Sequence, residues 1–404
     1  MMNYTAQEVI QYVKEDGVKF IRLAFCDPMG RQKNVAIMPS ELERAFDTGI
    51  AIDGSAITGF GQSVHSDLLL HPEAGTLTGL PWRPESGRVV RMFCRIYHPD
   101  GRAFACDSRR ILADAVAAAA ERGFSFSFGP EMEFYLFKSD ENGESSGVPH
   151  DRAGYMDIAP GDKGENIRRE ICLTLEKMGI RPETSHHEEG PGQNEIDFRY
   201  ADPMTAADNA QTFKAVAAAV AAGSGLCADF TPKPIQNAPG SGMHVNFSVK
   251  SRNAQDYLPQ AIAGIMEKIT DITAFLNPCE ASYMRLGGNK APCYVSWSAE
   301  NRSQLIRIPA ASGEYRRAEL RSPDPAANPY LAFALLIYAG LYGIENDLEL
   351  PMCADFDLFS APPELLRDFR RLPESLDQAR RLAAESAFVA GHLPKALVDF
   401  YCGR

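Results

Sequence analysis

Two acidic residues lie two positions apart in the segment 129–137, which begins with Gly-Pro and continues with aromatic and apolar residues. This composition predicts a β-strand. Residues two apart on a strand point to the same face, so Glu131 and Glu133 are expected side by side. Neighbouring carboxylates repel each other unless they are protonated, hydrated or bridged by a cation. Two isolated carboxylates spaced in this way most often lie on the solvent-exposed face of an edge strand. The apolar residues that follow instead favour a buried strand whose carboxylates face a cavity.

A second acidic segment, residues 185–198, has the pattern of a hairpin. Glu188 is expected at the end of its first strand and Glu195 at the start of its second, with a Gly-Pro-Gly turn between them. Such a hairpin can bring both carboxylates to the same end of a sheet. A charged hairpin tip exposed to water is the common alternative.

A third segment, residues 240–248, is a Gly-Ser-Gly loop followed by a strand that carries His244, Asn246 and Ser248 on one face. A single histidine among apolar residues is more often a hydrogen-bonded core residue than a metal ligand. Arginines then gather in the last third of the chain, and any one of them alone would be a surface charge: Arg285, Arg302, Arg307, Arg316, Arg317 and Arg321.

The chain therefore offers two sets of functional side chains. One consists of carboxylates with a histidine, and the other consists of arginines. Mg²⁺ takes oxygen ligands and commonly bridges protein carboxylates to substrate phosphates. Arginine forks suit phosphate and carboxylate oxygens. A site with both predicts phosphoryl transfer, in which catalysis is mostly positioning and neutralising charge. The chain has no P-loop and no Gly-x-Gly-x-x-Gly after a strand, so metal and arginine are expected to hold the phosphates.

The overall composition is that of a globular protein large enough for two domains, with 404 residues, 45% hydrophobic and 23% charged. A net charge of -12 argues against nucleic acid or an anionic membrane as a partner. No apolar run is long enough to cross a bilayer, and the polar N-terminus does not resemble a signal sequence. Nine cysteines without a Cys-x-x-Cys pair favour free thiols in the cytoplasm over disulfides or a thiolate metal site.

The first hundred residues predict a small α+β domain. A capping box at Thr5 and Glu8 opens a helix that ends near Asp16, and strands follow over 18–26 and 31–38. A second capping box, from Ser40, is expected to open a short helix. Two more hairpin strands are expected over 88–97 and 102–106, and the glycine-rich segment 53–60 is expected to be a loop.

The rest of the chain predicts a second domain in which helices alternate with acid-bearing strands, either α/β-like or α+β with a curved sheet. Asp107 and Ser108 cap its first helix, and residues 139–151 are expected to be a loop. Further helices are expected over 165–178, 206–222, 261–276 and 329–343.

The ordered motifs of this second part resemble those of the type I glutamine synthetases. They are Gly-Pro-Glu-Met-Glu-Phe, His-His-Glu-x-Gly-Pro-Gly-Gln-Asn-Glu, Gly-Ser-Gly-Met-His, Asn-Arg-Ser with Ile-Arg-Ile-Pro, and Glu-Leu-Arg-Ser-Pro-Asp-Pro. The likeness runs from about residue 18 to about residue 376. It implies an α+β protein with an N-terminal β-grasp domain at 1–103 and a catalytic domain at 104–404. In the family the catalytic domain's curved antiparallel sheet, also seen in the guanido kinases, forms a funnel for ATP at one end and glutamate at the other.

The resemblance also implies ligands for two Mg²⁺ or Mn²⁺ ions. It assigns Glu133, Glu188 and Glu195 to one ion, and Glu131, His244 and Glu319 to the other.

The same resemblance distributes the substrates over the site. The glutamate pocket is assigned Arg285, Arg321 and Gly240; the ATP site Arg302, Arg307, Asn246 and Ser248; and the ammonium site Asp53, Tyr155 and Glu188. Asp53, Glu188 and Arg302 carry the catalytic roles. In the family the aspartate reaches the funnel of a neighbouring subunit, which implies a ring-shaped homo-oligomer, a hexamer or a dodecamer.

Four departures from the family pattern bear on function. Lys290 stands where the family has a flap glutamate that helps to take a proton from ammonium, and a protonated lysine cannot do this. Asn246 replaces a second histidine and loses its titration near neutral pH. Phe359 replaces the tyrosine that is adenylylated in some members. The chain stops at Arg404, before the extension that helps to join two rings, so a single ring competes with a double one.

The leading hypothesis is an ATP-dependent ligase that forms glutamine from glutamate and ammonia through a γ-glutamyl phosphate. An alternative is a γ-glutamylamide synthetase that uses an organic amine or polyamine, which the loss of the flap glutamate favours. A non-catalytic family member is the third possibility, against which the complete sets of ligands and arginines argue.

Overall fold

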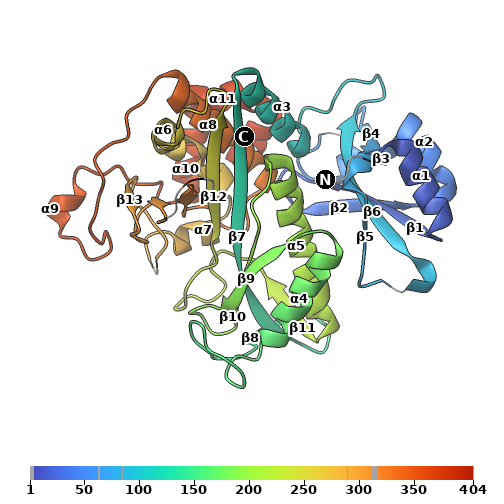
Figure 1. Cartoon of the computed structure of the whole chain (residues 1–404), viewed down its shortest axis with the longest axis horizontal. Coiled ribbons are helices and arrows are strands. Elements are labelled where there is room, and N and C mark those ends of the chain that lie inside the picture. The colour runs from blue at the N-terminus through green and yellow to red at the C-terminus, as the bar shows by residue number, and fades with distance from the viewer. Residues whose placement is uncertain are drawn as a thin grey trace.

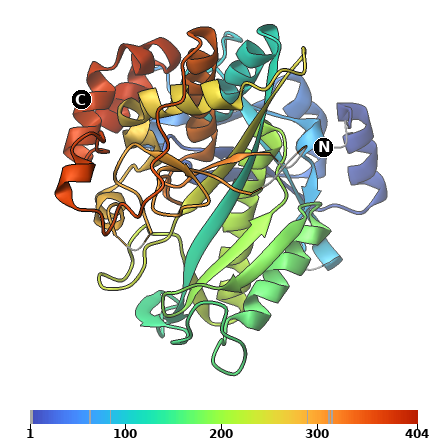
Figure 2. The same cartoon turned by 60° about the vertical axis from the view of Figure 1, so that its left-hand side comes forward.

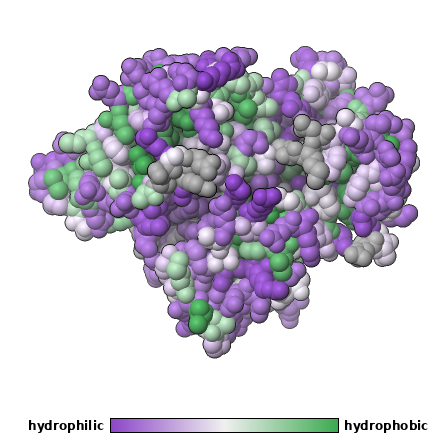
Figure 3. Space-filling view, in the orientation of Figure 1, coloured by the Kyte–Doolittle hydropathy of each residue, from purple (hydrophilic) through white to green (hydrophobic). Residues whose placement is uncertain are grey.

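Two β-sheets organise the protein, which is seen here in a computed structural model that describes residues 4–61, 64–83, 85–288, 290–310, 313 and 316–403. In Figure 1 the smaller sheet, with the N-terminal helices, lies on the right, and the larger sheet runs through the centre of the molecule. The face shown in Figure 3 is mostly hydrophilic, with hydrophobic side chains in small scattered groups. Across the described residues, no helix has the length and apolar character that a membrane crossing requires.

The smaller sheet has the strand order β2-β1-β6-β4-β3, with β5 added beside β6. Strands β1 and β6 pair in parallel, and the other pairs are antiparallel. This mixed sheet with its packed helices is the predicted β-grasp unit. Its elements are α1 (Ala6–Glu15), β1 (Phe20–Cys26), β2 (Gln32–Ile37), α2 (Leu42–Asp47), β3 (Ile50–Asp53), β4 (Asp67–Pro72), β5 (Thr78–Gly79) and β6 (Val89–Tyr97).

The larger sheet has the order β13-β14-β15-β12-β7-β10-β9, and β8 and β11 also pair with β7. It is antiparallel, as predicted, apart from the parallel pair β13–β14 at its edge. Its strands are β7 (Phe124–Ser139), β8 (Ser145–Pro149), β9 (Pro182–His187), β10 (Gln193–Phe198), β11 (Leu226–Asp229), β12 (Met243–Ser251), β13 (Trp297–Ala299), β14 (Ile306–Ile308) and β15 (Ala318–Leu320).

Helices cover this sheet, as the turned view in Figure 2 shows. They are α3 (Ser108–Glu121), α4 (Glu165–Lys177), α5 (Pro203–Gly223), α6 (Leu258–Leu276), α7 (Glu280–Arg285), α8 (Pro329–Glu345), α9 (Pro363–Leu366), α10 (Leu376–Glu385), α11 (Ala387–His392) and α12 (Lys395–Cys402). Helix α5 packs against β7 and β11, and α6 packs against α8. The last helix reaches back to the small domain, because the Tyr401 hydroxyl donates a hydrogen bond of 2.8 Å to the Pro28 carbonyl.

The two faces of strand β7 differ in polarity because apolar and acidic residues alternate along it. Met132, Phe134 and Leu136 are buried in the core, and the Phe134 ring lies 5.7 Å from the ring of Phe213 on α5. The alternate residues Glu131 and Glu133 point to the opposite face. Packing of α5 against one side of β7 therefore leaves the acidic side facing the polar cavity described below.

Most predicted elements are present, and three predictions of local structure were wrong. The Thr5–Glu8 capping box and the Asp107 cap form as predicted. Ser40 makes no capping bond, because a 3₁₀ turn at Pro39–Glu41 leads into α2. Residues 102–106 form no strand, and only a single bridge joins Ala103 to β6. The expected loop 139–151 contains β8, whose backbone pairs with the end of β7. All nine cysteines are free thiols.

Candidate active site

The register of three neighbouring strands brings the acidic segments together. Strands β7 and β10 place Glu133 opposite Glu195, and Glu131 opposite Asp197. On the other side of β7, His244 of β12 lies opposite Glu131. The pleat then turns these five side chains to one face of the sheet, as period-two alternation requires.

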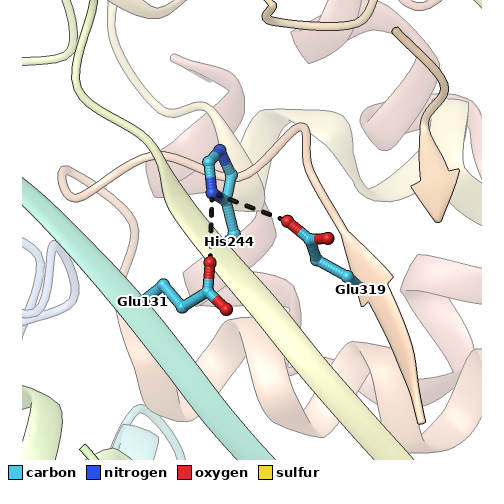
Figure 4. A group of neighbouring side chains, drawn as sticks. All are labelled: Glu131, His244 and Glu319. Carbon is cyan, nitrogen blue, oxygen red and sulfur yellow. Dashed lines mark ion pairs between the residues drawn. The ribbon is translucent and has the colours of Figure 1, made fainter. Parts of the chain in front are cut away.

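One group of candidate ligands is centred on His244 (Figure 4). Its Nδ1 atom lies 3.5 Å from a Glu131 oxygen and 3.8 Å from a Glu319 oxygen. Burial, followed by the positive charge of Arg321, lowers the pKa of His244, which favours the neutral imidazole that binds metals. Burial acts to raise the pKa of Glu319, but the charges of Arg321 and His244, together with the hydrogen bond from Arg307, lower that pKa overall.

A second group lies at the tip of the β9–β10 hairpin. The His186 ring is 3.6 Å from a Glu188 oxygen through Nδ1 and 3.5 Å from a Glu195 oxygen through Nε2. Glu133 accepts hydrogen bonds from the Gly242 amide at 2.8 Å and from Gln193 at 3.1 Å. Burial, and then the charge of Glu188, raise the pKa of Glu133 to about 7.

Buried hydrogen bonds fix the position of this hairpin. The Asp151 carboxylate contacts the His187 ring at 2.8 Å and accepts from the Gly192 amide at 3.1 Å. The same carboxylate accepts from the Lys163 amide at 3.0 Å. Asp151 and His187 therefore hold the loop that carries Glu188, and the acidic group they form with Asp162 already has partners.

Two residues at this site, Asp197 and His186, were not predicted from the sequence as metal ligands. Asp197 lies close enough to Glu131 and Glu195 to share a cation with them, and burial followed by the charge of Glu131 raises its pKa to about 7. His186 lies between Glu188 and Glu195. The signal for both was the spacing of two residues, since His186 precedes Glu188 by two and Asp197 follows Glu195 by two.

A polar cavity of about 450 Å³ joins these groups to the arginines. The predicted site residues that line it are Glu131, Glu133, Tyr155, Glu188, Glu195, Gly240, His244, Arg285, Arg302, Arg307 and Arg321. Glu319 is buried beside it and accepts a 2.8 Å hydrogen bond from Arg307. A buried set of carboxylates and a set of guanidinium groups therefore share one enclosed space.

The two arginines predicted for the glutamate pocket are fixed by backbone contacts. Arg285 donates to the Ser322 carbonyl at 2.7 Å and to the Arg321 carbonyl at 3.1 Å. Arg321 donates through Nε to the Arg302 carbonyl at 3.1 Å and also contacts the Glu319 carboxylate. Both side chains are almost completely buried, so their positions are set before any substrate arrives.

A second hollow of about 460 Å³ adjoins the first and shares Glu131, Asp197 and Arg317 with it. The structure places Asn246 and Ser248 here, so these two predicted residues lie apart from the arginine-lined cavity. Asn246 donates a 2.7 Å hydrogen bond to Glu131 and accepts one of 2.9 Å from Arg317. The polar space is thus continuous around Glu131.

Asp53 is not brought to the cavity within one chain. It ends β3 in the small domain, where its exposed carboxylate accepts a 2.9 Å hydrogen bond from the Ser55 amide. It does not line the cavity that holds the other predicted residues.

Lys290 lies at the margin of this cavity. It forms an ion pair with Glu189, and its ammonium group is 5.7 Å from the centre of the Tyr155 ring. The Glu189 amide in turn donates a 3.0 Å hydrogen bond to Glu188. Lys290 is therefore held against the loop that carries Glu188.

The donor set fits divalent cations. Three groups at the cavity offer oxygen atoms, and the ligand atoms of each lie within 4.8 Å of one another. They are Glu131 with His244 and Glu319, His186 with Glu188 and Glu195, and Glu131 with Glu195 and Asp197, and the first two also offer an imidazole nitrogen. Burial raises the pKa of Glu133, Glu188 and Glu195, and the charge of a neighbouring carboxylate raises each of them further. A bound cation would relieve that repulsion, and hard cations favour these oxygen donors.

Comparisons with known proteins give a consistent result. Residues 17–99 match the family described as "Glutamine synthetase, beta-Grasp domain", and residues 105–403 match "Glutamine synthetase, catalytic domain". The chain is 44% identical to the glutamine synthetase of Clostridium saccharobutylicum, over 100% of this chain and 94% of that protein. It is 43% identical to the glutamine synthetase of Methanosarcina mazei, over 98% of this chain and 92% of that one.

Solved structures have the same fold. A structure described as "GmaS/ADP complex-Conformation 1" has a TM-score of 0.88 and 27% identity, and the match covers 99% of this chain and 94% of that one. "Apo GmaS without ligand" also has a TM-score of 0.88, with 28% identity, over 97% and 93% of the two chains.

Proposed function

The chain belongs to the glutamine synthetase family, and from this premise we propose that it joins glutamate to ammonia with the hydrolysis of ATP. The observation that supports this most is the shared cavity of carboxylates, imidazole and arginines. Such a cavity can neutralise a phosphoryl group beside a substrate carboxylate. The proposed reaction forms a γ-glutamyl phosphate, which an amine nitrogen then opens with release of phosphate.

The two acidic groups are proposed to hold Mg²⁺ or Mn²⁺. Glu133, Glu188 and Glu195 would hold one ion, with His186 beside them. Glu131, His244 and Glu319 would hold the other. When bound, these ions would supply positive charge against the phosphate oxygens of ATP.

The arginines are proposed to position the substrates. Arg321 and Arg285 would grip the glutamate carboxylate near Gly240, since both are already fixed by backbone carbonyls. Arg302 and Arg307 would face the ATP phosphates, and Ser248 and Asn246 would lie towards the nucleotide in the adjoining hollow. Fixed guanidinium groups lose little freedom on binding, which favours a well-oriented reaction.

The acceptor end of the site would lie near Tyr155 and Glu188. Glu188 is proposed to take a proton from the attacking nitrogen, because its carboxylate lines the cavity together with Tyr155. Asp53 would complete this end from a neighbouring subunit. This requires an oligomer, which we propose to be a ring, and the small domain at 1–103 would then serve its neighbour's catalytic domain at 104–404. The free thiols favour a reducing cytoplasm.

A γ-glutamylamide synthetase is the second candidate, favoured by Lys290 in place of the flap glutamate. A panel of ammonia, methylamine, ethanolamine and polyamines, each with ATP and glutamate, separates the two functions by the rate of phosphate release. If the ratio of the maximal rate to the half-saturating concentration is highest with ammonia, glutamine synthesis is supported. A clear preference for an organic amine supports the second candidate.

A further inference from the structure

A separate cavity of about 620 Å³ lies between the small domain and helices α4 and α5. Figure 1 shows β5 and β6 beside these two helices. Its walls combine polar and apolar residues. The polar ones are Thr76, Thr78, Arg91, Glu176, Lys177, Thr205, Asp208, Asn209 and Thr212, and the others are Tyr4, Gly75, Leu77, Gly79, Phe93, Met178, Gly179 and Ile180. None of these residues lines the active-site cavity.

Arg91 of β6 is the unusual side chain in this wall. It is only 6% exposed, and its guanidinium carbon lies 3.9 Å from the centre of the Phe93 ring. Nη1 donates a 2.9 Å hydrogen bond to Thr212, whereas Nε is buried without a partner. Within the described part of the chain, no carboxylate lies at ion-pair distance from this guanidinium, and Nη2 donates to no residue. A buried cation without a counter-ion is costly.

The nearby carboxylates already have other partners. Asp208 accepts two bonds from Arg109, at 3.0 and 2.9 Å, and a third from the Tyr330 hydroxyl at 2.7 Å. Glu73 pairs with both Arg95 and Arg109. The charge of Arg91 therefore remains without a close partner, although Asp208 lies near enough to influence it.

Neutral hydrogen-bonding groups surround the same space. The Thr205 hydroxyl is buried without a partner, and Asn209 lies one helical turn further along α5. Lys177 adds a second cation to the wall, whereas Glu176 adds an anion. One negative group beside Arg91 is favoured over a molecule with many charges, because the carboxylates of Glu176 and Asp208 in the wall would repel a larger anion.

We propose that this cavity binds a small molecule through one oxyanion group, a carboxylate or a phosphate, held by Arg91. Nη2 would donate to the anion, with hydroxyl and amide groups of α5 beside it. The ligand would contact both the small domain and α5, whose Phe213 packs beneath β7. Binding would thus tie the small domain to the helix that supports the acidic strand, and it would stabilise the folded protein.

The test is titration calorimetry of the full chain with inorganic phosphate and, separately, with malonate. Asn209→Asp places a negative charge in the wall without removing a contact of the buried arginines, and Asn209→Gln is its neutral control. Arg91→Met tests the cation itself, with folding checked by circular dichroism. Arg321→Gln is the control for binding at the active site, because a probe that binds to the arginines there would bind less tightly to this variant.

We expect saturable binding of at least one probe, weakened by about tenfold or more in Asn209→Asp and Arg91→Met, the size of one lost charge contact. Asn209→Gln and Arg321→Gln should retain it. A response to only one probe identifies the anion as phosphate or carboxylate. The proposal is overturned if neither probe binds, or if binding survives in Asn209→Asp but disappears in Arg321→Gln.

Discussion

Glu133 and Glu195 are direct cross-strand neighbours, paired across the antiparallel strands β7 and β10. Like charges directly opposite each other destabilise a sheet. Burial and neighbouring carboxylates raise the pKa of both residues, as expected where charged groups are crowded away from water. The proposed cation binding would relieve this repulsion and would account for the arrangement.

Replacing Glu195 by Gln should abolish phosphate release while leaving the melting temperature unchanged or raised in metal-free buffer. The amide keeps the shape of the side chain but removes one of the repelling charges. Glu170→Gln, an exposed change on α4, is the control. Full turnover of Glu195→Gln would remove this residue from the metal site, and a large loss of melting temperature would mean that the pair stabilises the fold.

The Arg321→Lys variant should need a much higher glutamate concentration. Lysine keeps the charge but not the planar fork, and the loss of a charged hydrogen bond is about 1–3 kcal/mol, or roughly 5- to 150-fold in half-saturation. Steady-state kinetics with varied glutamate measure this. Arg316→Lys, in an exposed ion pair with Asp256, is the control. An unchanged glutamate dependence would place the substrate carboxylate elsewhere.

Mixing Asp53→Ala subunits with Glu195→Ala subunits should restore part of the activity. Asp53 lies outside the cavity of its own chain, so a site shared between subunits could combine one intact aspartate with one intact glutamate. Each variant alone is the baseline, and mixed oligomers are verified by mass spectrometry. No recovery in verified mixtures would mean that each site is built within one chain.

Lys290→Glu should raise the rate with ammonia, most clearly below the pKa of ammonium. Free ammonia is scarce there, and a base close to the attacking nitrogen helps most. Lys290→Gln also breaks the contact with Glu189 but adds no base, so it separates the two effects. Rates over a pH series measure the change. Equal rates in the Glu and Gln variants would show that a carboxylate at this position is dispensable.

Much of the site could be predicted because side chains alternate between the two faces of a strand. This alternation placed Glu131 with Glu133, and His244 with Asn246 and Ser248, on common faces before any pairing was known. The alternation could not show that Asn246 and Ser248 open into a separate hollow, because that depends on how β12 lies against its neighbours.

Tertiary pairing also explains what local pattern missed. Strand β8 forms because the end of β7 offers it a partner, whereas residues 102–106 make only a single bridge, through Ala103, to β6. His186 and Asp197 were overlooked although they share faces with Glu188 and Glu195. Their place in the acidic groups follows from the β7–β10 and β9–β10 registers, which no local signal fixes.

The most direct test of the account is phosphate release from ATP by the purified protein with Mg²⁺ or Mn²⁺. Glutamate and each amine of the panel are supplied together and singly, and the product is identified by mass spectrometry. The account predicts release that requires both glutamate and ammonia, with glutamine formed in equal amount. The account would be contradicted if the ratio of the maximal rate to the half-saturating concentration were higher with an organic amine than with ammonia. Phosphate release that does not depend on glutamate would also contradict it.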